Sequence, residues 1–147
     1  MHFYSLQMGP SAAQLTATNM QIADLTTAIR DMADTAALIE QLDLVICVDT
    51  AVAHLAGALA RPAWVLLPFA PDWRWLRERE DSPWYPTLRL FRQPKLRDWP
   101  SVIENVRNAL AKEADQLSMK SQKESVSSAP SSLSMRRAAR STSSMRP

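Results

Sequence analysis

The stretch at residues 44–57 decides the fold, and it reads Leu44-Val45-Ile46-Cys47-Val48-Asp49-Thr50-Ala51-Val52-Ala53-His54-Leu55-Ala56-Gly57. Its first five residues are all apolar and rich in β-formers, which is typical of a central strand with helices above and below it. A helical pattern follows at once, because the apolar side chains of Thr50–Leu59 fall on one stripe. A strand that leads directly into a helix is the building unit of an α/β fold.

Similar apolar runs recur on both sides of this stretch, at Phe3–Leu6, Met20–Ala23, Ala63–Leu67 and Leu88–Phe91. Helical patterns lie between or after them, at Ala12–Leu15, Asp34–Gln41 and Trp99–Ala111. We expect Asp34 to cap the second of these helices, since aspartate is a common N-cap residue. The alternation of strand and helix predicts a Rossmann-like parallel sheet with flanking helices.

The composition narrows the classes of protein further. The chain has 147 residues, 46% of them hydrophobic and 22% charged, which fits a globular protein with one main domain. It has only two glycines, Gly9 and Gly57, so a glycine-rich phosphate loop is excluded. Cys47 is the only cysteine, which excludes an internal disulfide and a cysteine-rich zinc site. No signal peptide and no membrane span are evident, and we expect a cytoplasmic protein.

The charge is distributed unevenly along the chain. Residues 118–147 hold eleven serines and six basic residues against the single Glu124, so they contribute +5 to a formal net charge of +2 and leave −3 for residues 1–117. We expect an ordered domain at residues 1–115 and a disordered, Ser-rich basic tail at residues 116–147. A solvated basic tail explains this charge better than contact with RNA, an acidic partner or a membrane surface, so we expect no nucleic-acid partner.

The turn between strand and helix is the main candidate site. Asp49 and Thr50 would lie at the carboxyl edge of the sheet, where open α/β sheets bind ligands. The first turn of the following helix offers free N–H groups and the positive end of the helix dipole to a phosphate or diphosphate. His54, one turn further on, can point to the same place. The alternative is structural: Asp49 or Thr50 is an N-cap, and His54 is a histidine bonded to a nearby carbonyl.

The 19 residues from Pro68 to Pro86 form an unusually long connection, of the kind that often carries function. Its aromatic residues Trp73, Trp75, Trp84 and Tyr85 can stack on a base or a sugar, and Arg74 can face an anion. They can equally form a small satellite core under the loop. The acidic residues Glu78, Glu80 and Asp81 alternate with arginines, so we expect a self-neutralised surface and no metal site. Cys47 lies in mid-strand, where we expect a small buried hydrophobe and not a nucleophile.

Several motifs together resemble one family. They are Asp34-Thr35-Ala36-Ala37-Leu38-Ile39, the segment Asp49–Leu59, and the loop motifs Asp72-Trp73-Arg74-Trp75 and Ser82-Pro83-Trp84-Tyr85-Pro86. Residues 2–110 resemble the donor-binding half of heptosyltransferase-like glycosyltransferases, family nine with the GT-B fold, in a subgroup fused to tetratricopeptide repeats. The resemblance then implies that residues 1–115 are a partial, nucleotide-sugar-binding C-terminal domain of that fold, and we expect the chain to be a fragment that begins at the second strand.

The resemblance implies roles for individual residues. The amides of Thr50, Ala51 and Val52 would hold the diphosphate of a nucleotide sugar, Asp49 a sugar hydroxyl, and His54 the phosphate side. It also places Gln7, Trp73 and Arg74 among the substrate-binding residues. The family transfers sugars directly and without a metal or other cofactor, which agrees with the lack of a D-x-D motif. One departure is Ala60, which replaces a glycine after the helix at a cost of about 1 kcal/mol.

Two functions follow from these observations. The first is the donor-binding portion of a glycosyltransferase, inactive alone and carrying no catalytic residue of its own, with an unknown protein or glycan acceptor. The second is a non-catalytic remnant or protein-interaction module. In the doubly wound order a further strand would separate Phe3–Leu6 from Leu44–Val48. Without it these strands pair directly, recruit another copy or the missing N-terminal half, or stay partly unfolded, so we expect marginal stability and self-association.

Overall fold

The computed structural model describes residues 1–127, and the chain divides into two compact units, residues 1–109 and residues 110–147. The first unit contains β1 (Phe3–Ser5), η1 (Pro10–Ala17), β2 (Ile22–Asp24), η2 (Thr26–Ala28), α1 (Met32–Glu40), β3 (Val45–Val48), α2 (Ala51–Ala58), β4 (Ala63–Leu67), η3 (Trp73–Trp75) and β5 (Leu88–Arg92), where η marks a 3₁₀-helix. It also contains the start of α3 (Trp99–Ser127). The described part of the second unit continues that helix. No helix within residues 1–127 has the length and apolarity needed to cross a membrane.

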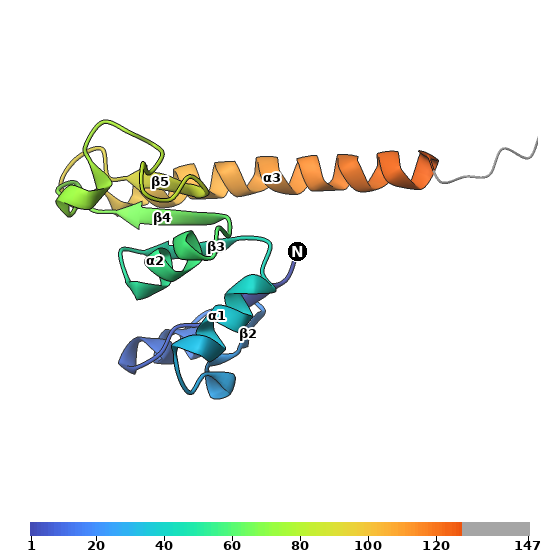
Figure 1. The fold of residues 1–147 in the computed structure, drawn as a ribbon, viewed down its shortest axis with the longest axis horizontal. Helices are drawn as coiled ribbons and strands as arrows, with labels where there is room; N and C mark the ends of the chain where they lie inside the picture. The colour runs from blue at the N-terminus through green and yellow to red at the C-terminus, as the bar shows by residue number, and fades with distance from the viewer. Residues whose placement is uncertain (128–147) are drawn as a thin grey trace, which may run out of the picture. The chain divides into compact units, whose positions relative to one another are not determined.

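Five parallel strands form two sheets, which confirms the α/β, Rossmann-like prediction. β1 pairs with β2, and the second sheet has the order β3-β4-β5. Helix α2 packs against β3 and β4, and α1 contacts α2 (Figure 1). The predicted strands agree with the observed ones to within two residues at each end.

The strand predicted to be central lies instead at an edge. β3 pairs with β4 on one side and, among the described residues, with no strand on the other, so direct pairing of β1 with β3 is not seen. Ile46 and Val48, which alternate with the buried Val45 and so project from the other face of the strand, are 40% and 50% exposed. β4 occupies the centre, and all five of its residues are buried. An apolar run therefore gave the correct element but the wrong place in the sheet, since position depends on which strands are available to pair.

The core lies on the face of the second sheet against which α2 packs, and one residue of α1 joins it. Its buried members are Ile39, Val45, Ala53, Ala56, Ala63, Val65, Leu67, Trp75, Leu88 and Leu90. Alternate positions of β4 and β5 point to the opposite face, where the rings of Trp64 and Phe91 pack with their centroids 5.1 Å apart. In α3 the residues Val102, Val106 and Ala109 are buried at helical spacing. Both faces of the sheet thus contribute buried apolar area.

Three helix boundaries differ from the predicted ones. Helix α1 begins earlier, and its cap is Asp31, whose carboxylate accepts from the amides of Ala33 and Asp34. Asp34 instead pairs with Arg30. The short helix predicted at Ala12–Leu15 is the longer 3₁₀-helix η1. Helix α3 begins at Trp99 as predicted but continues to Ser127, so residues 116–127, predicted as part of the disordered tail, are helical. The rest of that predicted tail lies outside the described residues.

Helix α2 ends in a complete Schellman motif built on an alanine. The amide of Arg61 donates to the carbonyl of Ala56 at 2.9 Å, and the amide of Ala60 donates to that of Gly57 at 3.1 Å. Ala60 has φ 53°, the left-handed conformation that glycine adopts without a steric penalty. The expected cost of an alanine at this position therefore has a structural basis.

We expect Ala60→Gly to raise the free energy of unfolding by about 0.5–1 kcal/mol, because it removes the left-handed penalty. Gly57→Ala, three residues earlier, is the matched contrast. It gains about 1 kcal/mol of helix propensity, yet its Cβ would overlap the ring of Tyr85, so we expect a net loss of about 1–2 kcal/mol. Urea unfolding of both variants measures the two effects. Two changes of the same sign would contradict this account of the helix end.

Candidate functional site

The turn from β3 to α2 leaves the start of α2 without a side-chain cap. Thr50 is the N-cap residue, but its hydroxyl donates to the carbonyl of Val48 at 3.3 Å and bonds no amide of the first turn. Helix α1 differs, since there the Asp31 carboxylate caps two amides. The amides of Ala51 and Val52 are thus available to an anion at the carboxyl edge of the sheet.

His54 lies one turn into α2 and has a polar neighbour near each ring nitrogen. Its Nε2 is 3.8 Å from Asp49 Oδ1, an ion pair only when the imidazole is protonated. Its Nδ1 is 3.3 Å from the hydroxyl of Tyr85. The imidazole also stacks on the indole of Trp75, with centroids 5.3 Å apart and planes 24° apart. The structure therefore brings Asp49 and His54 together, as the sequence predicted, and adds two aromatic residues from the loop.

Trp75 is held under His54 by the short helix η3. Its indole is 1% exposed. The Asp72 carboxylate caps η3 by accepting from the amide of Arg74. After η3, Leu76 has φ 49°, a left-handed value that is costly for a branched side chain. Arg92 of β5 holds this bend, because its Nη2 donates to the carbonyls of Trp75 at 3.2 Å and Leu76 at 2.6 Å.

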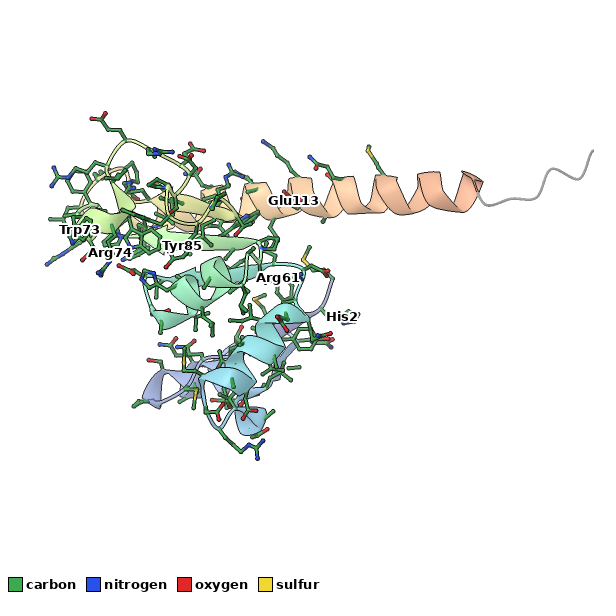
Figure 2. All side chains as sticks on the ribbon, in the orientation of Figure 1. His2, Arg61, Trp73, Arg74, Tyr85 and Glu113 are labelled. Carbon is green, nitrogen blue, oxygen red and sulfur yellow. The ribbon has the colours of Figure 1, made fainter. Side chains whose placement is uncertain are left out.

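Tyr85 reaches His54 by packing directly on α2. A Cβ built on Gly57 would overlap the Cγ, Cδ1 and Cβ atoms of Tyr85, so this close approach requires glycine at position 57. Figure 2 shows Tyr85 near α2, whereas Trp73 and Arg74 lie at the outer edge of the same loop. A glycine within a helix costs about 1 kcal/mol relative to alanine. The contact with Tyr85 gives a packing reason for that cost.

The sequence left open whether the loop aromatics form a small core or an exposed surface for stacking, and the structure shows some of them buried and others exposed. Trp75 joins the core, while Trp73 and Trp84 are 71% and 60% exposed. The indole N–H of Trp84 donates to the carbonyl of Arg74 at 3.2 Å, and the Arg74 guanidinium lies over the ring of Trp73 and beside Asp72. Trp73 and Arg74 are therefore accessible on the same short helix, η3, that carries the buried Trp75.

Gln7 follows β1, in the other sheet, and is exposed. Its amide donates to the hydroxyl of Ser5 at 3.2 Å. Within residues 1–127 no hydrogen bond or ion pair joins Gln7 to Asp49 or His54. The structure thus does not connect this predicted site residue with the others.

The acidic run in the loop is neutralised by arginines, as expected. Asp81 pairs with Arg79 at 2.7 Å, and this partner lowers the pKa of the Asp81 carboxyl. Glu80 lies 3.8 Å from Arg89. In the described part of the chain no group of three or more His, Cys, Asp or Glu residues could hold a metal ion.

Sequence reasoning considered Tyr85 and Trp75 only as possible stacking residues and missed their contacts with His54. Gly57 was the available signal, because an isolated glycine inside a helical pattern often marks close packing. The sequence does not say which residue packs there. That partner is 28 positions further along the chain and is set by the path of the loop.

The fold is that of an α/β domain with parallel sheets and flanking helices. Residues 10–66, which include β2, α1, β3 and α2, match the family model for glycosyltransferase family 9 (heptosyltransferase), so this part of the chain is glycosyltransferase-like. Over 80 residues, or 54% of its length, the chain is 38% identical to Protein FlbA of Caulobacter vibrioides. The match spans only 13% of that relative. No solved structure matches the chain.

Cys47 precedes the site by two residues and is an unreactive thiol. It packs against the core, and this burial, with a smaller contribution from Asp49, raises its pKa from 9.0 to about 11. Thiolate is the nucleophilic form, so little of it exists at neutral pH. This agrees with the expected role as a small apolar residue.

The raised pKa of Cys47 predicts a loss of stability in alkali. The folded state holds the thiol proton more tightly than the unfolded state, so this contribution is complete below pH 9 and is lost as the pH rises towards 11. The free energy of unfolding lost over this pH range is about 2–3 kcal/mol. We expect the difference in unfolding free energy between the natural chain and Cys47→Ala to narrow over this range in urea titrations. A constant difference, or rapid alkylation of folded Cys47 at pH 7, would contradict the assignment.

Proposed function

We propose that this domain binds the diphosphate of a nucleotide-sugar donor at the start of α2. The observation that carries the proposal is the uncapped first turn of α2 beside the Asp49–His54 pair, at the carboxyl end of a parallel strand. A helix start of this kind offers N–H groups and a positive dipole end to an anion. The segment that matches the glycosyltransferase family model includes all of these residues.

Each residue then has a distinct role. The amides of Thr50, Ala51 and Val52 bind diphosphate oxygens. Asp49, a carboxylate that only accepts, binds a sugar hydroxyl, because a carboxylate next to a phosphate without an intervening donor would be repelled. His54 supports the phosphate side.

The exposed loop residues extend this site. Trp73 offers a flat apolar face on which a base or a sugar can stack, and Arg74 offers a positive charge close to it. The acceptor, protein or glycan, is not identified by these contacts. Gln7 stays a prediction, since it has no described contact with the start of α2.

Titration with UDP, GDP and ADP sugars, followed by tryptophan fluorescence, tests the proposal. Trp75 stacks on His54, so a ligand that reaches His54 alters the surroundings of an indole. We expect Asp49→Ala and His54→Ala each to weaken the binding of nucleotide sugar about tenfold, the size of one hydrogen bond to a charged group. Asp43→Ala is the matched control, because this exposed aspartate lies before β3, at the other end of the strand.

The proposal fails if the natural chain binds one of these nucleotide sugars and neither Asp49→Ala nor His54→Ala changes the affinity. Equal losses in Asp43→Ala would also count against it, since they would indicate a general effect of charge.

A second candidate function, favoured by the free edge of β3, is a protein-interaction module. Edge strands usually carry charges that prevent pairing with other chains. β3 instead presents the apolar side chains of Ile46 and Val48, both substantially exposed, beside its unpaired backbone groups. Such an edge can accept a further strand.

This second function predicts concentration-dependent self-association of the chain. We expect Ile46→Lys and Val48→Lys to reduce it in sedimentation velocity experiments, because a lysine on the edge disfavours strand pairing. Ile103→Lys, at an exposed apolar position in α3, is the matched control. A chain that stays monomeric at all concentrations, with a sharp cooperative melt, would exclude this use of the edge.

A further inference from the structure

Tyr85 makes a contact with His54 that donor binding does not by itself explain. Its hydroxyl lies 3.3 Å from Nδ1, and its ring meets the imidazole edge-on, with centroids 5.8 Å apart. The ring is fixed independently by Gly57, because it fills the space that a Cβ there would occupy. This packing on Gly57 places the Tyr85 hydroxyl beside His54.

Asp49 and Tyr85, the two polar neighbours of the His54 ring, favour the same tautomer of the neutral imidazole. Asp49 Oδ1 lies 3.8 Å from Nε2, which is beyond hydrogen-bond distance, but its negative charge favours a proton on this nitrogen and leaves that N–H group free for a ligand. The phenol of Tyr85 can donate, and it then requires Nδ1 to be the acceptor. A neutral imidazole has one donor and one acceptor nitrogen, and this assignment satisfies both neighbours.

We propose that Tyr85 is a positioning residue that fixes His54 with Nδ1 as acceptor and Nε2–H as donor, so that His54 offers an N–H group to an anionic oxygen. This inference rests on the proposed function and specifies it. With Nδ1 accepting from Tyr85, the N–H group of neutral His54 is at Nε2. Its role toward a diphosphate is that of a hydrogen-bond donor.

The buried indole of Trp75 reinforces this orientation. It stacks on the face of the imidazole and limits rotation of the ring about its χ2 axis, which would turn Nδ1 away from the Tyr85 hydroxyl. Trp75 supplies apolar contact, whereas Tyr85 supplies the only side-chain hydroxyl recorded at His54 within the described residues. Removing that hydroxyl alone separates the hydrogen bond from the packing.

Tyr85→Phe is the decisive variant, since it keeps the ring against Gly57 and removes only the oxygen. The chain has two tyrosines and two histidines, which provides internal controls. Tyr4→Phe removes the other phenol, and His2 serves as the reference histidine in the same spectrum. Long-range ¹H–¹⁵N NMR reports which ring nitrogen carries the proton and whether the bare nitrogen accepts a hydrogen bond.

We expect the Nδ1 resonance of His54 to show an accepted hydrogen bond in the natural chain and in Tyr85→Phe to move to the position of a free acceptor nitrogen. Tyr4→Phe should leave it unchanged, and His2 should not respond to either variant. An Nδ1 resonance that is the same with and without the Tyr85 hydroxyl, or a proton found on Nδ1 of neutral His54, would overturn the inference.

Binding of inorganic pyrophosphate provides the second measurement. If Tyr85 positions His54 for an anion, Tyr85→Phe should weaken pyrophosphate binding about three- to tenfold, the size of one neutral hydrogen bond, and Tyr4→Phe should not. An altered Nδ1 resonance without any change in affinity would overturn the positioning role. If the natural chain binds neither pyrophosphate nor a nucleotide sugar, the proposed function fails, while the proton assignment is still decided by NMR.

Discussion

The close contact between the ring of Tyr85 and the backbone of Gly57 is the constraint on which the arrangement of the site depends. It places the long loop after β4 directly on α2, with no side chain in between. The imidazole of His54 therefore lies between Tyr85 and Trp75, two residues of that loop, and not between residues of its own helix. A single Cβ at position 57 would displace the loop and with it both partners of the histidine.

Local sequence pattern was sufficient for most of the fold, and the reason is physical. β4 was predicted with the observed bounds because five apolar residues stand between Pro62 and Pro68, which stop a strand at both ends. The place of β3 at an edge could not be predicted in this way. A strand that is apolar on both faces looks the same whether or not a neighbour pairs with it, and only the set of available strands decides the outcome.

The candidate site shows the same division between near and distant residues. Asp49, Thr50 and His54 lie within six positions of each other, so the turn from strand to helix brings them together by itself. Tyr85 is 31 residues from His54 along the chain, and its contact depends on the course of a loop with little regular structure. Gln7 illustrates the converse case, in which a resemblance suggests a role that no described contact supports.

Arg92 has a consequence for the energetics of recognition. Its guanidinium holds the carbonyls on both sides of the bend at Leu76, and the loop is thus ordered by the protein itself. Ordering a flexible segment on binding costs conformational entropy, which is subtracted from the affinity. In this domain that entropy is lost during folding, so an incoming molecule meets a surface whose shape is already set, and its association need not wait for a loop to close.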